Sequence, residues 1–363
     1  MTHEIVAARP LAGTGSLDVS GRSAAEVLSA ARRRRGRRRA LVIGALAAAL
    51  AAVFLITLCV GNTFYPLGDV VRVVLGEQVP GASFTVGTLR LPRAITGLLA
   101  GIAFGLAGVT FQTMLRNALA SPDVIGITSG ASAAAVFAIT ILGAGGAVVS
   151  VLAVTSGLGA ALVIYLLAYR NGLSGARLIL IGIGVGAMLD SVVSYLLLKS
   201  SAFEVQAALR WLTGSLGSAF WEGVPPLALS LAVLLPLIIV LTRRLTALQL
   251  GDESATALGV RVDRTRLLLI VVAVALAGVA TATTGPIAFV AFLAGPIAAR
   301  LVGGGRSLLI PAGLVGGLLV LTADLLGQFA FDTSFPVGVV TGAIGAPYLL
   351  YLLIRSNRSG GSL

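Results

Sequence analysis

The chain has 363 residues, of which 57% are apolar and 11% are charged. Soluble proteins carry roughly a quarter charged residues, so this composition excludes a water-soluble fold. The net charge of +12 comes almost wholly from arginine, because Lys199 is the only lysine.

The residue inventory also excludes several kinds of chemistry. Cys59 is the only cysteine and His3 the only histidine, so no disulfide, thiolate or histidine metal site, or serine-histidine triad can be assembled. A nucleotide-binding P-loop needs glycine followed by lysine and then serine or threonine, whereas Lys199 follows Leu198. Any ATP hydrolysis linked to this protein must therefore occur on another chain.

Residues 1–40 mix Gly, Ser and Arg without periodicity and predict a flexible cytoplasmic tail. They end in the runs Arg32–Arg35 and Arg37–Arg39, directly before an apolar stretch at 40–60. A basic cluster beside an apolar span is typical of an orientation signal, and we favour this over a nucleic-acid patch or a secretory signal. The same arginines can contact anionic lipid.

Ten apolar stretches predict helices that cross the bilayer, and they cover residues 40–60, 91–112, 123–142, 147–169, 177–198, 224–243, 265–284, 287–302, 308–328 and 337–354. The stretch at 287–302 is short and contains Pro296, so we expect a broken or tilted helix that lines a cavity. The sequence therefore predicts an all-α, polytopic membrane fold. Its membrane domain covers 41–355, between the tail at 1–40 and a second tail at 356–363.

The charge distribution predicts an orientation for these spans. With the amino terminus inside, 21 of the 26 Lys and Arg residues lie on the cytoplasmic side and five lie outside. This bias follows the positive-inside rule, so we expect both termini in the cytoplasm.

The second span begins after Arg90-Leu91-Pro92-Arg93 and carries Gly97, Gly101 and Gly105 at four-residue spacing. This spacing places the glycines on one helix face, which predicts close packing against another helix. The two arginines at the external mouth can receive carboxylates from a soluble partner, or they can snorkel to the membrane interface. The residues alone leave both interpretations open.

Two carboxylates fall inside predicted spans. Asp190 lies near the middle of the fifth span, with Ser191, Ser194 and Tyr195 as polar neighbours, and Asp324 lies near the external end of the ninth. Because a carboxylate is costly in hydrocarbon, we expect each to face a partner or a water-filled cavity. Each can equally have a structural role as a hydrogen-bonded group.

A cytoplasmic segment after the sixth span predicts a short helix. Asp252 and Glu253 suit its first turn, Ala255 and Leu258 predict a small apolar face, and Gly259 can end it. We interpret this segment as a knob that docks in a groove of a partner. An ordinary solvated loop is an equal alternative from these residues alone.

Four sequence blocks resemble the permease subunits of bacterial ABC importers for ferric siderophores, haem and cobalamin, the large-cavity class with about ten helices per subunit. The blocks are Arg90–Arg93, Gln112 with Arg116–Asp123 and Gly126, Gly285–Val290, and Pro336–Pro347. The residues Glu253-Ser254-Ala255, with Gly259 four positions later, also resemble the coupling motif of ABC importer permeases generally. The resemblance runs from about Arg90 to Leu353.

The resemblance implies a transport subunit that is not itself an enzyme and binds no metal or cofactor. ATP and Mg²⁺ would be held by two cytoplasmic ATPase subunits. The other partners would be a second permease, related or identical, and an extracytoplasmic binding protein. The cargo would be a ferric siderophore complex, crossing the bacterial cytoplasmic membrane.

Individual residues take roles from the same resemblance. The ATPase-coupling loop would contain Gly251, Asp252, Glu253, Ser254, Ala255, Leu258 and Gly259. Arg90 and Arg93 would receive acidic residues of the binding protein. The cytoplasmic gate would contain Asn117, Leu119, Gly175 and Ala176, and we expect Gln112, Asp190 and Asp324 to line the translocation path.

The sequence departs from the family pattern at a few positions. Ala118 stands where the family usually has proline, which loosens the expected turn after the second span. Gln328 stands where some members place a third docking arginine, and Ser334 where an acidic residue is common. External docking is therefore expected to rely on Arg90 and Arg93 alone.

The alternatives to this function are a different cargo, a different source of energy for transport, and a membrane enzyme. Within the same machinery, haem or cobalamin is an alternative cargo. An ion-coupled secondary transporter would use Asp190 or Asp324 as ion sites. A membrane enzyme would need convergent catalytic groups, and the residue inventory argues against it.

Overall fold

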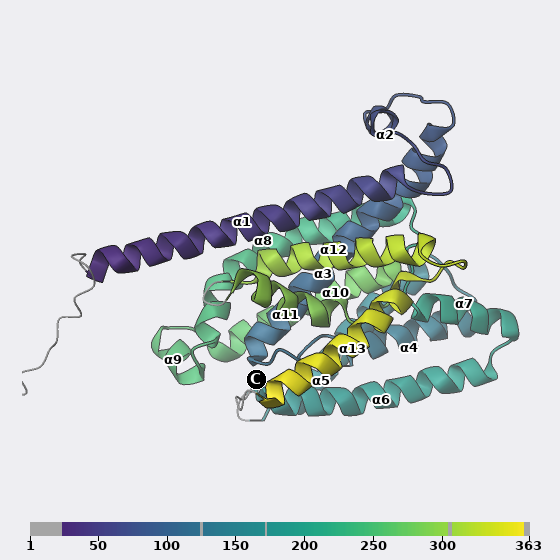
Figure 1. The fold of residues 1–363 in the computed structure, drawn as a ribbon. Helices are drawn as coiled ribbons and strands as arrows, with labels where there is room; N and C mark the ends of the chain where they lie inside the picture. Colours follow the sequence, from purple (N-terminus) through teal and green to yellow (C-terminus); the bar gives the residue numbers. More distant parts are fainter. Residues whose placement is uncertain (1–23, 124–125, 171–172, 304–306, 359–363) are drawn as a thin grey trace, which may run out of the picture. The chain divides into compact units, whose positions relative to one another are not determined.

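The structure is a computed structural model that describes residues 24–123, 126–170, 173–303 and 307–358 (Figure 1). Within these ranges the chain forms helices and loops, with one isolated β-bridge between Tyr169 and Leu173. The predicted all-α fold is confirmed. The elements are α1 Ala24–Cys59, α2 Leu67–Val74, η1 Ser83–Arg90, α3 Leu91–Leu115, α4 Ile127–Thr140, α5 Ala147–Ala168, α6 Gly175–Lys199, α7 Ala202–Leu212, η2 Trp221–Gly223, α8 Val224–Leu248, α9 Asp252–Ala257, α10 Val262–Thr284, α11 Val290–Val302, α12 Leu309–Phe329 and α13 Val337–Arg358.

Contacts divide the chain into two units, residues 1–41 and 42–363, close to the predicted boundary of the amino-terminal tail. In the first unit, the prediction of a flexible tail is wrong for residues 24–40, which belong to α1. These residues are rich in Ala and Arg, and such strong helix formers extend a helix beyond the membrane span. Residues 1–23 of the predicted tail, and 359–363 at the other end, lie outside the described residues.

The helices account for all ten predicted spans. Among the residues that the structure describes, seven helices are long and apolar enough to cross a membrane: α1, α3 together with η1, α5, α6, α8, α10 and α12. Three shorter apolar helices, α4, α11 and α13, match the remaining predictions. The predicted start of the third span was wrong, because α4 begins at Ile127 and not at 123. Gly126 directly precedes it with a left-handed φ of 80°, which breaks the helical path.

The helix α3 lies at the centre of the second unit, where it packs against α8, α10, α11 and α12. Its predicted glycine face is confirmed. A Cβ built on Gly101 would lie 2.5 Å from the Gly316 carbonyl oxygen on α12, and one built on Gly105 would collide with the Ala312 carbonyl oxygen. The absence of side chains at these glycines lets the backbones of α3 and α12 approach closely.

The predicted break in the 287–302 span is present. The helix α11 has 13 residues, so it is about 20 Å long, against about 30 Å of hydrocarbon. Phe289 directly precedes it with a left-handed φ of 64°. Ile287 and Val290 are 1% and 0% exposed, so this irregular backbone is buried in protein, the condition under which it is tolerated at membrane depth.

The helices place two groups of loops at opposite ends of the second unit (Figure 1). One group, the α9 end, contains residues 113–123, 126, 169–170, 173–176 and 249–262. The other group, the α2 end, contains residues 60–93, 200–223 and 324–337. The candidate functional residues gather at these two ends.

Candidate functional site

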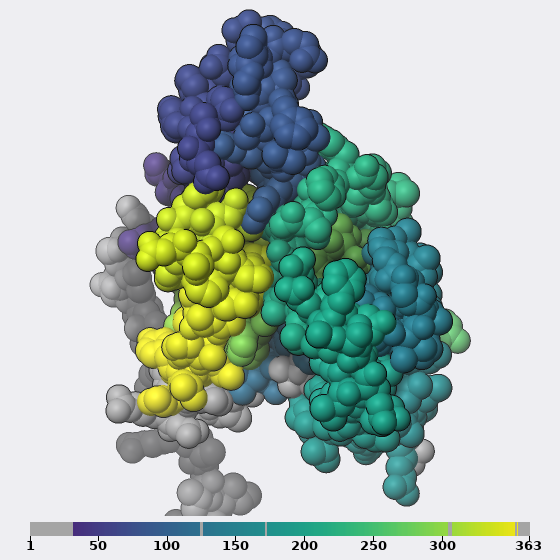
Figure 2. All heavy atoms as spheres, turned by 90° about the vertical axis from the view of Figure 1, so that its right-hand side faces the viewer, coloured from purple at the N-terminus to yellow at the C-terminus, as the bar shows by residue number. Residues whose placement is uncertain are grey.

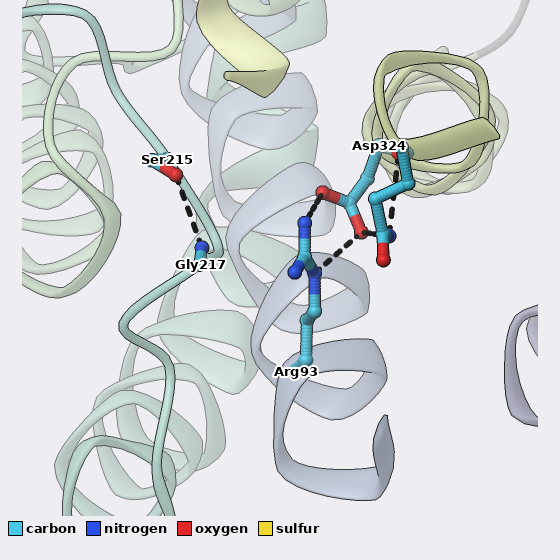
Figure 3. Close-up of polar contacts among 5 residues, drawn as sticks. Arg93, Ser215, Gly217 and Asp324 are labelled. Atoms are coloured by element: carbon cyan, nitrogen blue, oxygen red, sulfur yellow. Dashed lines mark hydrogen bonds and ion pairs between the residues drawn. The ribbon is translucent and has the colours of Figure 1, made fainter. Parts of the chain in front are cut away.

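The best-defined polar cluster at the α2 end joins α3 to α12 (Figure 3). Arg93 Nε and Nη2 donate to the two carboxylate oxygens of Asp324 at 2.9 and 2.7 Å. Gln328 Nε2 donates to Asp324 Oδ2 at 2.8 Å, one turn further along α12. The Asp324 side chain is only 5% exposed and that of Arg93 is 26% exposed. The cluster is therefore a bidentate ion pair that is closed on the carboxylate side.

The other predicted docking arginine has its contacts within the chain as well. Arg90 Nη1 donates to the carbonyl oxygens of Leu58 and Cys59 at 2.9 and 3.1 Å, and Nη2 donates to that of Thr63 at 2.7 Å. Its guanidinium lies 5.2 Å from the centre of the Tyr65 ring. Arg90 therefore fixes the end of α1 and the loop that follows, within the second unit.

Arg90 and Arg93 share a small hollow with Asp324 and Gln328, closed on another side by Thr57 and Val60. The described residues thus place both predicted docking arginines at the rim of one hollow, but each already has an internal partner. Their role in docking stays a prediction. Asp324, expected in the translocation path, lies at this hollow and is neutralised by Arg93.

Other cations at the α2 end are more exposed. Lys199 and Arg210, at the ends of α6 and α7, are both exposed. The helix α7 between them begins with a capping box, in which the Ser201 backbone N–H lowers the pKa of Glu204. Figure 2 views this end, with the teal residues of α6 and α7 on one side and the yellow residues of α13 on the other.

At the α9 end, the predicted coupling loop forms the short helix α9. Gly251 before it and Gly259 after it have left-handed φ values of 102° and 80°, so glycine suits both turns. Glu253 and Ser254 are exposed, and Leu258 is 65% exposed. The loop therefore presents an acidic and apolar surface beyond the helix bundle.

One prediction for the coupling loop was wrong, the small apolar face made by Ala255 and Leu258. Ala255 and Leu258 do not share an exposed face, because Ala255 is 0% exposed and belongs to the main hydrophobic core. The helix ends at Ala257, so the three-residue spacing does not continue to Leu258. Ala255 anchors α9 to the bundle, and the exposed apolar side chains are those of Leu250 and Leu258.

Two arginines that the sequence reasoning did not assign surround Asp252. Arg266 Nη2 donates to Asp252 Oδ1 at 2.8 Å, and Arg116 Nη2 lies 3.9 Å from the same oxygen. Arg266 is 6% exposed and also donates from Nη1 to the Leu173 carbonyl oxygen at 2.9 Å. In the sequence, Arg266 was only a cation at the start of a span, which is usually a membrane-interface residue, and Arg116 was only part of a block shared with the resembled family.

The two predicted gate segments lie together at the α9 end. The Asn117 side-chain oxygen accepts from the Leu119 N–H at 2.8 Å, which fixes the turn after α3. A Cβ built on Gly175 would lie 3.3 Å from the Leu115 side chain, so the start of α6 packs against the end of α3. Ala176 beside it is exposed. This contact brings the start of α6 against the end of α3, the two places that carry the gate residues, and their gating role stays a prediction.

The predicted path residues occupy different environments. Gln112 is buried, and its Nε2 donates to the Phe292 carbonyl oxygen at 2.9 Å, tying α3 to α11. Asp190 is exposed on α6, and no described residue pairs with its carboxylate. Ser194 Oγ donates to the Asp190 backbone carbonyl and not to the side chain. Asp190 therefore faces out of this chain.

A family profile described as the FecCD transport family matches residues 49–355. The achromobactin transport system permease protein of Dickeya dadantii (strain 3937) is 40% identical over 310 residues, or 84% of this chain and 89% of that protein. The ferric enterobactin transport system permease protein of Escherichia coli (strain K12) is 39% identical over 291 residues, or 80% and 88%.

A further relative and a solved structure extend the likeness. The cobalamin import system permease protein of Halobacterium salinarum is 37% identical over 282 residues, covering 75% of this chain and 74% of that protein. A metal-chelate type ABC transporter, solved in an inward-facing conformation, superposes with a TM-score of 0.78 at 26% identity. That match covers 86% of this chain and 99% of the other.

Proposed function

The chain belongs to the FecCD transport family, and from this membership we propose that it is the permease subunit of an ABC importer for a ferric siderophore complex. The observation that carries the proposal is the position of α9. This short, exposed helix lies at one end of a membrane helix bundle, and the sequence contains no nucleotide-binding P-loop. Such a chain needs a partner that hydrolyses ATP and a surface on which that partner docks.

The ATPase partner is proposed to bind α9 through Glu253, Leu250 and Leu258. These side chains are exposed, whereas Ala255 on the opposite side holds the helix to the core. ATP and Mg²⁺ would be bound by two ATPase subunits, and this chain would bind neither. With the ATPase bound there, the α9 end would be in the cytoplasm and the α2 end outside, an orientation that the arginine bias of the loops supports.

A second permease is proposed to face α6. Asp190 is exposed near the middle of this helix and has no partner among the described residues. A carboxylate at membrane depth is costly against lipid. A water-filled path between two permease chains, identical or related, removes that cost. Cargo entering from a binding protein at the α2 end would cross this path.

Transport is proposed to be a change between two arrangements of the helices. Binding of ATP to the partner subunits would favour one arrangement, and hydrolysis would restore the other. The constriction would be formed by Asn117 and Leu119 with Gly175 and Ala176, which already lie at adjoining helix ends. No covalent chemistry on this chain is required.

The cargo is inferred from relatives. Proteins named for ferric enterobactin and achromobactin transport are 39% and 40% identical to this chain, which supports a ferric siderophore complex. Cobalamin is the second candidate, because a cobalamin import permease is 37% identical.

The first experiment measures uptake of labelled iron, supplied as several ferric siderophore complexes, as ferric citrate and as haem, beside labelled cobalamin. Cells with and without this chain are compared. Loss of uptake for one ferric siderophore complex is the expected result. Loss of cobalamin or haem uptake alone would overturn the proposed cargo, and uptake that fails with an uncoupler while cellular ATP is maintained would favour an ion-coupled transporter.

A pair of matched variants tests the ATPase surface in the same assay. Glu253→Arg reverses an exposed charge on α9, and Glu222→Arg reverses an exposed charge at the α2 end. We expect the first to abolish uptake and co-purification of the ATPase while its level in the membrane is unchanged. The second should retain both, and normal uptake with Glu253→Arg would contradict the assignment of α9.

A further inference from the structure

The guanidinium of Arg266 occupies an unusual position for a charged group. It lies near the start of α10, is 6% exposed, and bridges two segments that are distant in sequence. One arm donates to the Asp252 carboxylate and the other to the Leu173 carbonyl oxygen, at 2.8 and 2.9 Å. Its Nε is buried without a hydrogen-bond partner among the described residues.

Burial of the Arg266 guanidinium costs free energy that an apolar side chain at the same position would not cost. Burying a cation is unfavourable unless it is well paired, and here the single anionic partner, Asp252, is 46% exposed. Asp252 can therefore exchange Arg266 for water, whereas Arg266 has no exposed alternative. The bond between them is one that a movement of α9 would break or form.

The partners of Arg266 lie at the two functional segments of this end. Asp252 is the first residue of α9, the proposed ATPase-docking helix. Leu173 lies two residues before Gly175, where α6 and the second predicted gate segment begin. Arg266 thus joins the docking helix to the start of α6 through side-chain and backbone atoms alone.

A second cation extends the junction to the other gate segment. Arg116 Nη2 lies 3.9 Å from the Asp252 oxygen that Arg266 binds. Arg116 is the residue before Asn117 and has a left-handed φ of 51°, so it forms the end of α3. The Asp252 carboxylate is therefore shared by cations attached to both gate segments.

From this geometry we propose that Arg266 is a positioning residue that transmits movement of α9 to the two gate segments, by holding Asp252 and the Leu173 carbonyl together. The proposal rests on the proposed function, because α9 moves only if an ATPase partner drives it. We call the contacts of Arg266 with Asp252 and with the Leu173 carbonyl oxygen the clamp, and both contacts are formed in this structure. A state in which Asp252 leaves Arg266 would free the start of α6 and the end of α3 from α9.

The test uses the complete complex, with its second permease, ATPase subunits and loaded binding protein, reconstituted in lipid. The variants are Arg266→Gln, Arg266→Lys and Asp252→Asn, and the matched control is Arg264→Gln, an exposed arginine in the same turn. Basal ATP hydrolysis, its stimulation by the loaded binding protein, and cargo moved per ATP are measured. Arg264→Gln should match the wild-type complex in all three.

We expect Arg266→Gln to retain assembly and basal hydrolysis. Both Arg266→Gln and Asp252→Asn should lose about fivefold or more of the cargo moved per ATP, the size of a typical coupling. The double variant should lose no more than either single one, because both break the same contact. Arg266→Lys should recover part of the loss. Unchanged coupling in both single variants, or additive losses, would overturn the role of Arg266.

A second readout does not depend on transport. Spin labels at Ala257 on α9 and Ser174 before α6, both exposed and neither assigned to the docking surface or the gate, are placed in a Cys59→Ser background. In the wild-type complex the distance between the labels should change between nucleotide-free and ATP-bound states, and in Asp252→Asn the distributions should broaden and lose this dependence. If the distance between the labels in the wild-type complex does not change with ATP or with the ATPase, the proposed function fails. If Asp252→Asn shows the wild-type change in full, only the role of the clamp fails.

Discussion

The two ends of the molecule use ion pairs in different ways. At the α2 end, Arg93 and Asp324 form a bidentate pair whose carboxylate is 5% exposed, between two helices that are in close backbone contact. At the α9 end, Asp252 is 46% exposed and is shared by Arg266 and Arg116. The first pair fixes two helices together, and the second can exchange partners with water. At the α2 end the buried charges must stay paired for the helices to stay together, whereas at the α9 end the Asp252 charge is available for communication.

The largest expected effect comes from breaking the α2-end pair on one side. Arg93→Ala leaves the Asp324 carboxylate buried without its cation, which should lower the free energy of unfolding by about 3–5 kcal/mol. Thermal unfolding of the purified chain in detergent measures this.

A double variant of Arg93 and Asp324 distinguishes the effect of an unpaired buried charge from the effect of lost side-chain packing. Replacing both partners, as Arg93→Met with Asp324→Leu, removes the buried charges and should recover most of the stability. If Arg93→Ala unfolds at the wild-type temperature, the contrast between the two ends is wrong.

A smaller loss is expected at Arg90. Arg90→Ala removes three hydrogen bonds to the carbonyl oxygens of Leu58, Cys59 and Thr63, and should lower stability by about 2 kcal/mol, as for a few hydrogen bonds to a charged group. The loop after α1 should also become more sensitive to protease. Limited proteolysis at residues 60–66 measures this, with Lys199→Ala as the control, and equal cleavage of the two variants would argue against the anchoring role.

Next in size is the effect of charge reversal on binding at the α2 end. Lys199→Glu with Arg210→Glu changes two exposed cations, so stability should stay within about 0.5 kcal/mol. Association of an acidic binding protein should slow by about tenfold at low salt and by less at high salt. Stopped-flow or surface-based association rates measure this. A rate that does not depend on the two charges would leave docking to Arg90 and Arg93.

The smallest effect on stability is expected at α9. Glu253→Arg alters an exposed side chain, so the free energy of unfolding should be unchanged within about 0.5 kcal/mol. The same variant should abolish binding of the ATPase, which co-purification measures. A marked loss of stability would show that the α9 end, like the α2 end, is held together by its charges.

The features that could be predicted from sequence are those with a local pattern. Hydropathy located all ten spans, and the four-residue glycine spacing identified the face of α3 that meets α12. The acidic residues and glycines around α9 were sufficient to locate that helix. Each of these features is written within about twenty consecutive residues, so a single stretch of chain carries the whole signal.

The features that were missed depend on pairs of distant residues. Arg93 and Asp324 are 231 positions apart, and each was assigned a separate role, because nothing in either stretch shows that they meet. Arg266 resembled an ordinary membrane-interface cation until the structure placed Leu173 and Asp252 beside it. Ala255 was assigned to the docking face because the end of α9 at Ala257 could not be located from residue types.

The separation of Arg93 from Asp324 also has a consequence for how the protein is made. At about 5–20 residues per second, Asp324 is synthesised about 12 to 46 s after Arg93. During this interval α3 exists without α12, so its glycine face and the Arg93 guanidinium have no partner from that helix. A ribosome that stalls before α12 would leave a membrane fragment with both features exposed. This fragment is the species that quality-control proteases of the membrane would be expected to recognise.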